Sequence, residues 1–226
     1  MNVVLFDIDG TLLSTGGAGT YALREALRDA FGVAEPQDVP VSGRTDRGIA
    51  RNMLLTHGLP DTDDNWRQFR DAYLRHLGRQ LPLRTGRVLP GVHELLGSLA
   101  GRVDVLIGLL TGNLHEGARL KLRHYQLDHH FAFGGFGDRH PDRDSVAAEA
   151  LAATRAHAGE RPISPDRVWV IGDTPFDITC GRSIGAKTVA VATGTYERDS
   201  LAAFEPDMLL DTLDAVPDLV NRLLGP

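Results

Sequence analysis

Short apolar runs rich in β-branched residues recur along the chain, and segments with helical periodicity separate them. The clearest runs are Val3–Ile8, Val103–Leu110, Val168–Ile171 and Thr188–Ala192, with weaker ones at Phe131–Phe136 and Met208–Leu210. Continuous apolar runs of this length are typical of strands that are buried on both faces. Strands that alternate with helices predict a parallel sheet with helices on both faces, so we expect a Rossmann-like α/β core.

The interval between the first two runs is too long for an ordinary crossover. More than ninety residues separate Ile8 from Val103, whereas a crossover needs only a helix and two short loops. Most of this interval has helical periodicity, and the helix Val92–Leu99 would supply the crossover itself. We therefore expect residues 15–87 to form a helical cap inserted into an α/β core, which residues 1–14 and 88–226 would make up.

Composition and charge exclude several classes of function. A formal net charge of −6 disfavours nucleic acid as a partner, because binding to a phosphate backbone relies on an excess of Lys and Arg. The longest apolar run, Val105–Leu110, is too short to span a membrane, and the first residues lack the basic region of a signal peptide. Cys180 is the only cysteine, which excludes an intramolecular disulfide. We expect a soluble, cytoplasmic protein, and the sequence leaves its oligomeric state open.

Two aspartates, Asp7 and Asp9, stand at the end of the first predicted strand, followed by Gly10 and Thr11. Functional groups gather at the carboxyl ends of strands in open α/β sheets. An Asx-type turn would explain Asp9 and Gly10, but it leaves an ionisable Asp7 inside an apolar run without a partner. A cation is the natural partner, and Mg²⁺ prefers a few carboxylate oxygens together with waters and phosphate.

Two later strands end in the same way. Val168–Ile171 leads into Gly172, Asp173 and, four residues further, Asp177. Val103–Leu110 leads into Thr111-Gly112-Asn113, a hydroxyl followed by a flexible turn that is rich in donors. Because the carboxyl ends of parallel strands share one edge of the sheet, the three polar clusters are expected to meet there.

With these motifs in this order, the sequence resembles the haloacid dehalogenase superfamily, which consists mostly of phosphatases. The first motif of the superfamily matches Asp7-Ile8-Asp9-Gly10-Thr11, the second matches Thr111, and the fourth matches Gly172-Asp173 with Asp177. The helical insertion after the first motif is similar to that of C1-capped members such as phosphoglycolate phosphatases. True haloacid dehalogenases lack an aspartate at the position of Asp9, so Asp9 favours phosphate-ester chemistry.

The resemblance implies catalytic roles for the acidic pair. Asp7 would attack phosphorus and become a phospho-aspartate. Asp9 would protonate the leaving oxygen and then deprotonate the hydrolytic water. Thr111, with the neighbouring Gly112 and Asn113, would hold the transferring phosphoryl oxygens.

The resemblance also implies a Mg²⁺ site. The carboxylates of Asp7 and Asp173 and the backbone carbonyl of Asp9 would hold the metal, and Asp177 would support the site. Without this cation, an anionic nucleophile would approach an anionic phosphate.

The superfamily places a Lys or Arg between the second and fourth motifs. Arg143, just before the predicted helix Val146–Ala156, is our choice, because the starts of helices are common phosphate sites. Lys121, on the predicted helix after Thr111, is the competing candidate. Arg44 lies between two predicted cap helices, where C1-capped relatives carry a substrate-specificity loop. It would meet a substrate carboxylate or a second phosphate, unless this loop serves only to cap a helix with Thr45 or Asp46.

The resulting hypothesis is a Mg²⁺-dependent phosphatase that acts on a small phosphomonoester. A phosphomutase of the same superfamily and a non-catalytic phosphate- or nucleotide-binding module are the alternatives. Gly17-Ala18-Gly19-Thr20-Tyr21-Ala22 also fits the dinucleotide fingerprint, but that fingerprint should follow its strand directly, and residues 9–15 intervene. The sequence does not select one phosphate ester.

Overall fold

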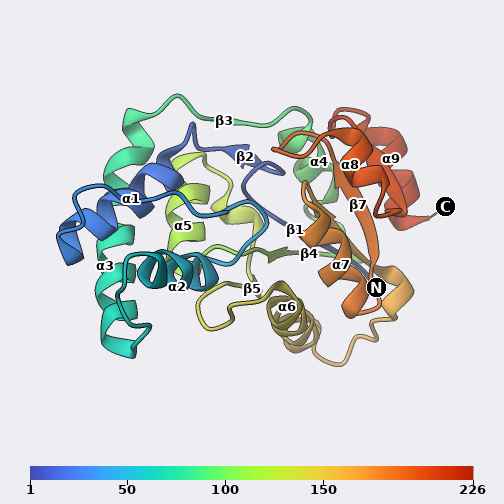
Figure 1. Cartoon of the computed structure of the whole chain (residues 1–226). Coiled ribbons are helices and arrows are strands. Elements are labelled where there is room, and N and C mark those ends of the chain that lie inside the picture. Colours follow the sequence, from blue (N-terminus) through green and yellow to red (C-terminus); the bar gives the residue numbers. More distant parts are fainter. Residues whose placement is uncertain (226) are drawn as a thin grey trace.

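The computed structural model describes residues 1–225 (Figure 1). Its main sheet has the order β5-β4-β1-β6-β7-β8, and all neighbouring strands in it are parallel. These strands are β1 (Asn2–Phe6), β4 (Val105–Leu110), β5 (Gly134–Gly135), β6 (Val168–Gly172), β7 (Lys187–Val191) and β8 (Met208–Leu210). Two further strands, β2 (Leu13–Ser14) and β3 (Arg87–Val88), form a small antiparallel ribbon. The predicted α/β fold is confirmed.

Helices cover both faces of the sheet, and the alternation of side chains along β1 shows how. The helices of the core are α4 (Val92–Leu99), α5 (His115–His124), α6 (Arg143–Ala158), α7 (Pro175–Ser183), α8 (Arg198–Ala202) and α9 (Val216–Leu224). Val4 and Phe6 pack in one apolar cluster with α4, α5 and α9, whereas Val3 and Leu5 pack in another with α6 and α7. Successive side chains of a strand point to opposite faces, so one continuous apolar run serves both layers.

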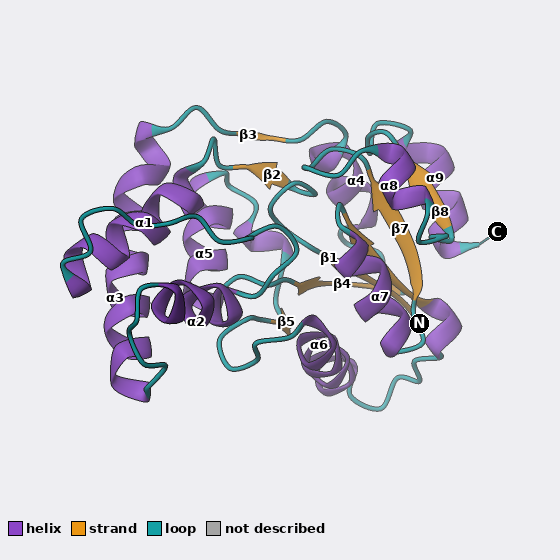
Figure 2. Ribbon diagram, viewed as in Figure 1, coloured by secondary structure: helices purple, strands orange, loops and turns teal. Residues whose placement is uncertain are grey.

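The interval after β1 contains α1 (Ala18–Phe31), α2 (Asp46–Thr56) and α3 (Asp63–Gln80). These helices share an apolar cluster of their own, to which Leu114 at the start of α5 contributes. Figure 2 shows them grouped beyond the end of the sheet toward which β1 and β4 run. The antiparallel pairing of β2 and β3 brings the two ends of this interval together. The division into a core and a cap of residues 15–87 stays a prediction.

Element ends differ from the predicted ones for local reasons. Strand β4 begins at Val105 rather than at Val103, whose side chain is 88% exposed in the preceding turn. Helix α2 takes Thr45 as its N-cap, because the Thr45 hydroxyl accepts a hydrogen bond from the backbone N–H of Gly48 at 3.0 Å. Asp46, the other capping candidate, is the first residue of the helix. Within residues 1–225, no helix is both long and apolar enough to cross a membrane.

Candidate active site

Asp7 and Asp9 follow β1 at the centre of the sheet. The N–H of Asp7 still donates to the carbonyl of Ile171 on β6 at 3.0 Å, so the strand geometry continues to the carboxylate, which is buried. The chain then turns at Gly10, whose φ of +85° is in the left-handed region that favours glycine. A Cβ atom on Gly10 would lie 2.4 Å from Oδ2 of Asp173. The turn therefore needs glycine both for its conformation and for the approach of the second acidic strand end.

Asp7, Asp173 and Asp177 form a cluster of buried carboxylates. One oxygen from each lies within 4.8 Å of the others. Asp173 accepts a hydrogen bond from the hydroxyl of Thr11 at 3.1 Å. Asp177 accepts from the backbone N–H of Thr174 at 3.0 Å and from its hydroxyl at 2.7 Å, which closes a capping box at the start of α7. The prediction that these strand ends meet is confirmed.

Arg143 is the first residue of α6, and its guanidinium reaches into the carboxylate cluster. Asp142 is the N-cap of this helix and accepts a hydrogen bond from the backbone N–H of Ser145 at 2.8 Å. Nη1 of Arg143 lies 3.5 Å from Oδ1 of Asp7, and Nη2 forms an ion pair with Asp177. Burial by itself would lower the pKa of Arg143, but Asp177 and Asp7 raise it further than burial lowers it. Arg143 is therefore a fixed positive charge between two acids.

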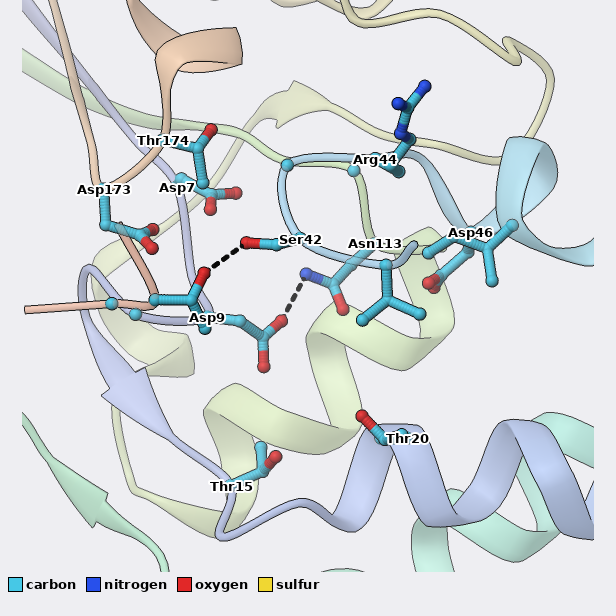
Figure 3. Close-up of a pocket in the computed structure, with 18 of the residues that line it drawn as sticks. Asp7, Asp9, Thr15, Thr20, Ser42, Arg44, Asp46, Asn113, Asp173 and Thr174 are labelled. Carbon is cyan, nitrogen blue, oxygen red and sulfur yellow. Dashed lines mark hydrogen bonds between the residues drawn. The ribbon is translucent and has the colours of Figure 1, made fainter. Parts of the chain in front are cut away.

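Lys121 occupies a different position in the same site. It projects from α5 and is only 3% exposed. Its Nζ lies 2.5 Å from Oδ2 of Asp9 and 2.5 Å from Oδ1 of Asn113. Nδ2 of Asn113 also donates to Oδ2 of Asp9 at 2.8 Å (Figure 3). The two cations that competed in the sequence are both present, with Arg143 beside Asp7 and Lys121 beside Asp9.

The turn after β4 supplies the remaining polar groups. Thr111 is fully buried, and its hydroxyl accepts hydrogen bonds from the backbone N–H and the side-chain amide of Asn113 at 3.3 and 2.8 Å. A Cβ atom on Gly112 would lie 2.1 Å from the carbonyl oxygen of Arg44, so only glycine allows this turn to touch the loop before α2.

The charges of the site do not balance. Four carboxylates (Asp7, Asp9, Asp173 and Asp177) face two cations. Burial, followed by the charge of Asp177, raises the pKa of Asp7 to about 7 despite Arg143. Burial and the neighbouring acids also raise the pKa of Asp173 well above its ordinary range. Excess buried negative charge of this kind calls for a cation.

The residues present fit a divalent metal ion. The three clustered carboxylates are hard oxygen ligands of the type that Mg²⁺ prefers. The carboxylate of Asp173 packs directly against Gly194, since a Cβ atom on Gly194 would lie 1.7 Å from Oδ2 of Asp173. This close contact holds the Asp173 side chain in place. Both oxygens of Asp177 already bind Arg143 and Thr174, so Asp7 and Asp173 are the carboxylates with oxygens free for a metal.

A cavity of about 410 Å³ opens beside these residues. Its floor is the edge of the sheet where β1, β4 and β6 end, and residues of α1, α2 and α3 form the opposite wall. Arg44 contributes to the rim, but its guanidinium lies over the ring of Phe176 at 5.1 Å and points away from Asp7 and Asp9 (Figure 3). Its role in binding substrate stays a prediction.

Several residues of the cavity were missed by reasoning from the sequence. Asp46 was considered only as a possible helix cap and Tyr73 was given no role, because no local pattern marks them as polar groups of a cavity. Thr193 and Gly194 did carry a signal, because they form a Thr-Gly turn directly after the predicted strand Thr188–Ala192. The hydroxyl of Thr193 donates to the carbonyl of Gly10 at 2.6 Å, which ties this fourth strand end to the first.

Comparison with known proteins agrees with this geometry. A phosphoglycolate phosphatase of Synechococcus elongatus is 28% identical over 226 residues, which cover 99% of each chain. An N-acetylmuramic acid 6-phosphate phosphatase of Pseudomonas aeruginosa is 27% identical over 237 residues, covering 99% of this chain and 96% of that protein. The crystal structure of a hydrolase from Pseudomonas syringae, 20% identical, covers both chains completely with a TM-score of 0.74, a likeness of fold. Residues 4–182 match the family described as haloacid dehalogenase-like hydrolase, and the chain belongs to that family.

Proposed function

We propose that the chain is a Mg²⁺-dependent phosphatase that hydrolyses a small phosphomonoester through a phospho-aspartyl intermediate on Asp7. The observation that carries the proposal is the placement of Asp7. Its carboxylate is buried at the floor of the cavity, beside Arg143 and the clustered Asp173. The names of the relatives support it, since they include phosphatases of phosphoglycolate and of N-acetylmuramic acid 6-phosphate.

In the first step, a carboxylate oxygen of Asp7 attacks phosphorus, and the bond from phosphorus to the leaving oxygen breaks. Asp9 gives its proton to that oxygen, and the alcohol leaves. In the second step, Asp9 takes a proton from water, the water oxygen bonds to phosphorus, and the bond to Asp7 breaks, which releases phosphate. Lys121 and Asn113 hold the carboxylate of Asp9 in place for both proton transfers.

Arg143 and the turn after β4 stabilise the negative charge on Asp7 and on the phosphoryl group during these steps. Arg143 keeps Asp7 oriented and offsets the charge of Asp7 and Asp177. Thr111, Gly112 and Asn113 present donors at the end of β4, where the phosphoryl oxygens would lie. Asp7 and Asp173, with the backbone carbonyl of Asp9, would hold Mg²⁺. When bound, the ion supplies positive charge against the phosphoryl oxygens.

Release of phosphate from p-nitrophenyl phosphate and from a panel of small phosphate esters tests this proposal. We expect turnover in Mg²⁺ that EDTA abolishes and that Asp7→Asn abolishes without loss of folded protein. Asp211→Asn, a change of an acid whose side chain is 79% exposed, is the matched control and should keep full activity. Turnover that persists in Asp7→Asn would contradict the role of Asp7, and silence of the wild type across the whole panel would contradict the phosphatase assignment.

A further inference from the structure

The cavity is larger than a phosphoryl group requires. At about 30 Å³ for each water-sized position, 410 Å³ corresponds to about fourteen non-hydrogen atoms, of which a phosphate accounts for five. The rest of the space extends toward α1, α2 and α3. Figure 3 shows Thr15 and Thr20 on the side toward which the carboxylate of Asp9 points. This part of the cavity is where the leaving group would lie, so its polar groups decide which leaving group fits.

Tyr73 is a buried donor on this wall. The side chain projects from α3 and is only 2% exposed, and its hydroxyl has no hydrogen-bond partner within residues 1–225. A Cβ atom on Gly19 would lie 4.0 Å from this hydroxyl and 3.7 Å from Nζ of Lys121, so the hydroxyl borders the open space in front of Gly19. Because Tyr73 lines the cavity, this hydroxyl can donate a hydrogen bond to a ligand group in that space or accept one from it.

Asp46 is a buried acceptor on the same wall. Two contacts fix it on the turn after β4: its N–H donates to the carbonyl of Gly112 at 2.7 Å, and its Oδ2 accepts from the N–H of Leu114 at 2.8 Å. Oδ1 has no hydrogen-bond partner among the described residues, and no cation of residues 1–225 forms an ion pair with this carboxylate. Burial raises the pKa of Asp46 to about 6, so the group is mostly ionised at pH 7.

The balance of charge on this wall selects the chemistry of the ligand. Lys121 forms its ion pair with Asp9 and acts on Asp46 only from a distance, so Asp46 keeps a charge without an ion pair of its own. Arg44, another cation of the cavity lining, lies over the ring of Phe176 and points away from Asp7 and Asp9. A leaving group that carries a carboxylate would meet this charge, whereas a hydroxyl group can donate to Asp46 and accept from Tyr73. The hydroxyls of Thr15 and Thr20 can both donate and accept, which suits a ligand with several hydroxyls.

We propose that Asp46 and Tyr73 select a neutral, hydroxyl-bearing leaving group, so that the substrate is a phosphate ester of a polyol or sugar rather than of a hydroxy acid. This inference rests on the proposed phosphatase function and specifies the substrate class of the same site. Asp46 and Tyr73 contact the leaving group and take no part in the chemical steps.

Three phosphate esters with the same three-carbon skeleton test the proposal: propyl phosphate, glycerol 3-phosphate and 3-phosphoglycerate. In the wild type, we expect kcat/KM for glycerol 3-phosphate to exceed that for each of the other two by about tenfold, the effect of one or two hydrogen bonds. Tyr73→Phe should lower the ratio of glycerol 3-phosphate to propyl phosphate about tenfold. Asp46→Asn should lower the preference for glycerol 3-phosphate over 3-phosphoglycerate by a similar factor, because it removes the charge and keeps the acceptor for Leu114.

The matched control is Tyr21→Phe, which removes a phenol hydroxyl from a residue of α1 that lies outside the cavity and should keep both ratios. Ratios are taken within one preparation, so any loss of folded protein cancels. Preference of the wild type for 3-phosphoglycerate, or ratios that neither variant changes, would overturn the inference while leaving the phosphatase assignment intact. No turnover of any ester, p-nitrophenyl phosphate included, would overturn the proposed function and this inference with it.

Discussion

Replacing Asp7 by Asn should stabilise the metal-free protein while it abolishes turnover. Burial, and then the charge of Asp177, raises the pKa of Asp7 from 3.8 to about 7 in the folded state. Between these two values the folded state holds a proton that the unfolded state has lost, so the free energy of unfolding falls as the pH rises through this window. At about 1.4 kcal/mol for each pH unit, an ionised Asp7 destabilises the folded protein by about 4 kcal/mol above pH 7.

Asn keeps the shape of Asp7 and removes its charge, but it weakens the 3.5 Å contact with Arg143. We therefore expect a net gain of about 2–4 kcal/mol in EDTA at pH 8, and a smaller gain at pH 5, where the wild-type Asp7 is largely protonated. Urea unfolding at both pH values measures this difference. Asp211→Asn, which removes only an exposed ion pair with Arg198, is the control and should change the free energy of unfolding by less than about 1 kcal/mol at either pH. Added Mg²⁺ should reduce the stability advantage of Asp7→Asn over the wild type. The wild type keeps both carboxylates that would hold the ion, so Mg²⁺ should stabilise it more than the variant. Loss of stability at pH 8 in EDTA, or an equal gain at both pH values, would refute the reasoning.

Three other substitutions test the surroundings of the site. Arg143→Met should lower the free energy of unfolding by about 3–5 kcal/mol in urea titrations, because it leaves two buried carboxylates without their cation. Tyr125→Phe should raise that free energy by about 1 kcal/mol, since the Tyr125 hydroxyl is buried without a partner in the described chain. Gly194→Ala should weaken Mg²⁺ binding about tenfold or more by calorimetry, because its Cβ atom would displace Asp173. A decrease in stability for Tyr125→Phe, or unchanged Mg²⁺ affinity for Gly194→Ala, would count against these assignments.

The α/β fold was predictable because burial on both faces leaves a clear pattern. Val3 to Phe6 are all apolar, since the alternating side chains of β1 enter two different layers of helices. Strand limits were less predictable, because Val103 was counted with the strand although Arg102 and Asp104 flank it. The structure places Val103 in the turn before β4, where it is 88% exposed.

The meeting of polar side chains at one edge of the sheet was predictable for a related reason, and the cavity wall was not. Asp7, Thr111 and Asp173 each interrupt an apolar strand at its end, and parallel topology then brings the strand ends together without further information. Asp46 and Tyr73 lie on helices, where one polar residue beside an apolar stripe is ordinary. Their position in the cavity depends on how α2 and α3 pack against the turn after β4, which is a contact between segments far apart in the sequence.

Reasoning from the sequence treated the two basic candidates as alternatives, but both lie in the site. Arg143 and Lys121 were treated as competitors because a single cation was expected between the second and fourth motifs. In the structure each serves its own carboxylate: Arg143 lies beside Asp7, and Lys121 lies beside Asp9. Even with both cations present, the acids outnumber them, and burial, followed by the charge of the neighbouring acids, raises the pKa values of Asp7 and Asp173. A bound divalent cation would remove the excess, so the same imbalance that destabilises the metal-free protein is what should make the site bind Mg²⁺.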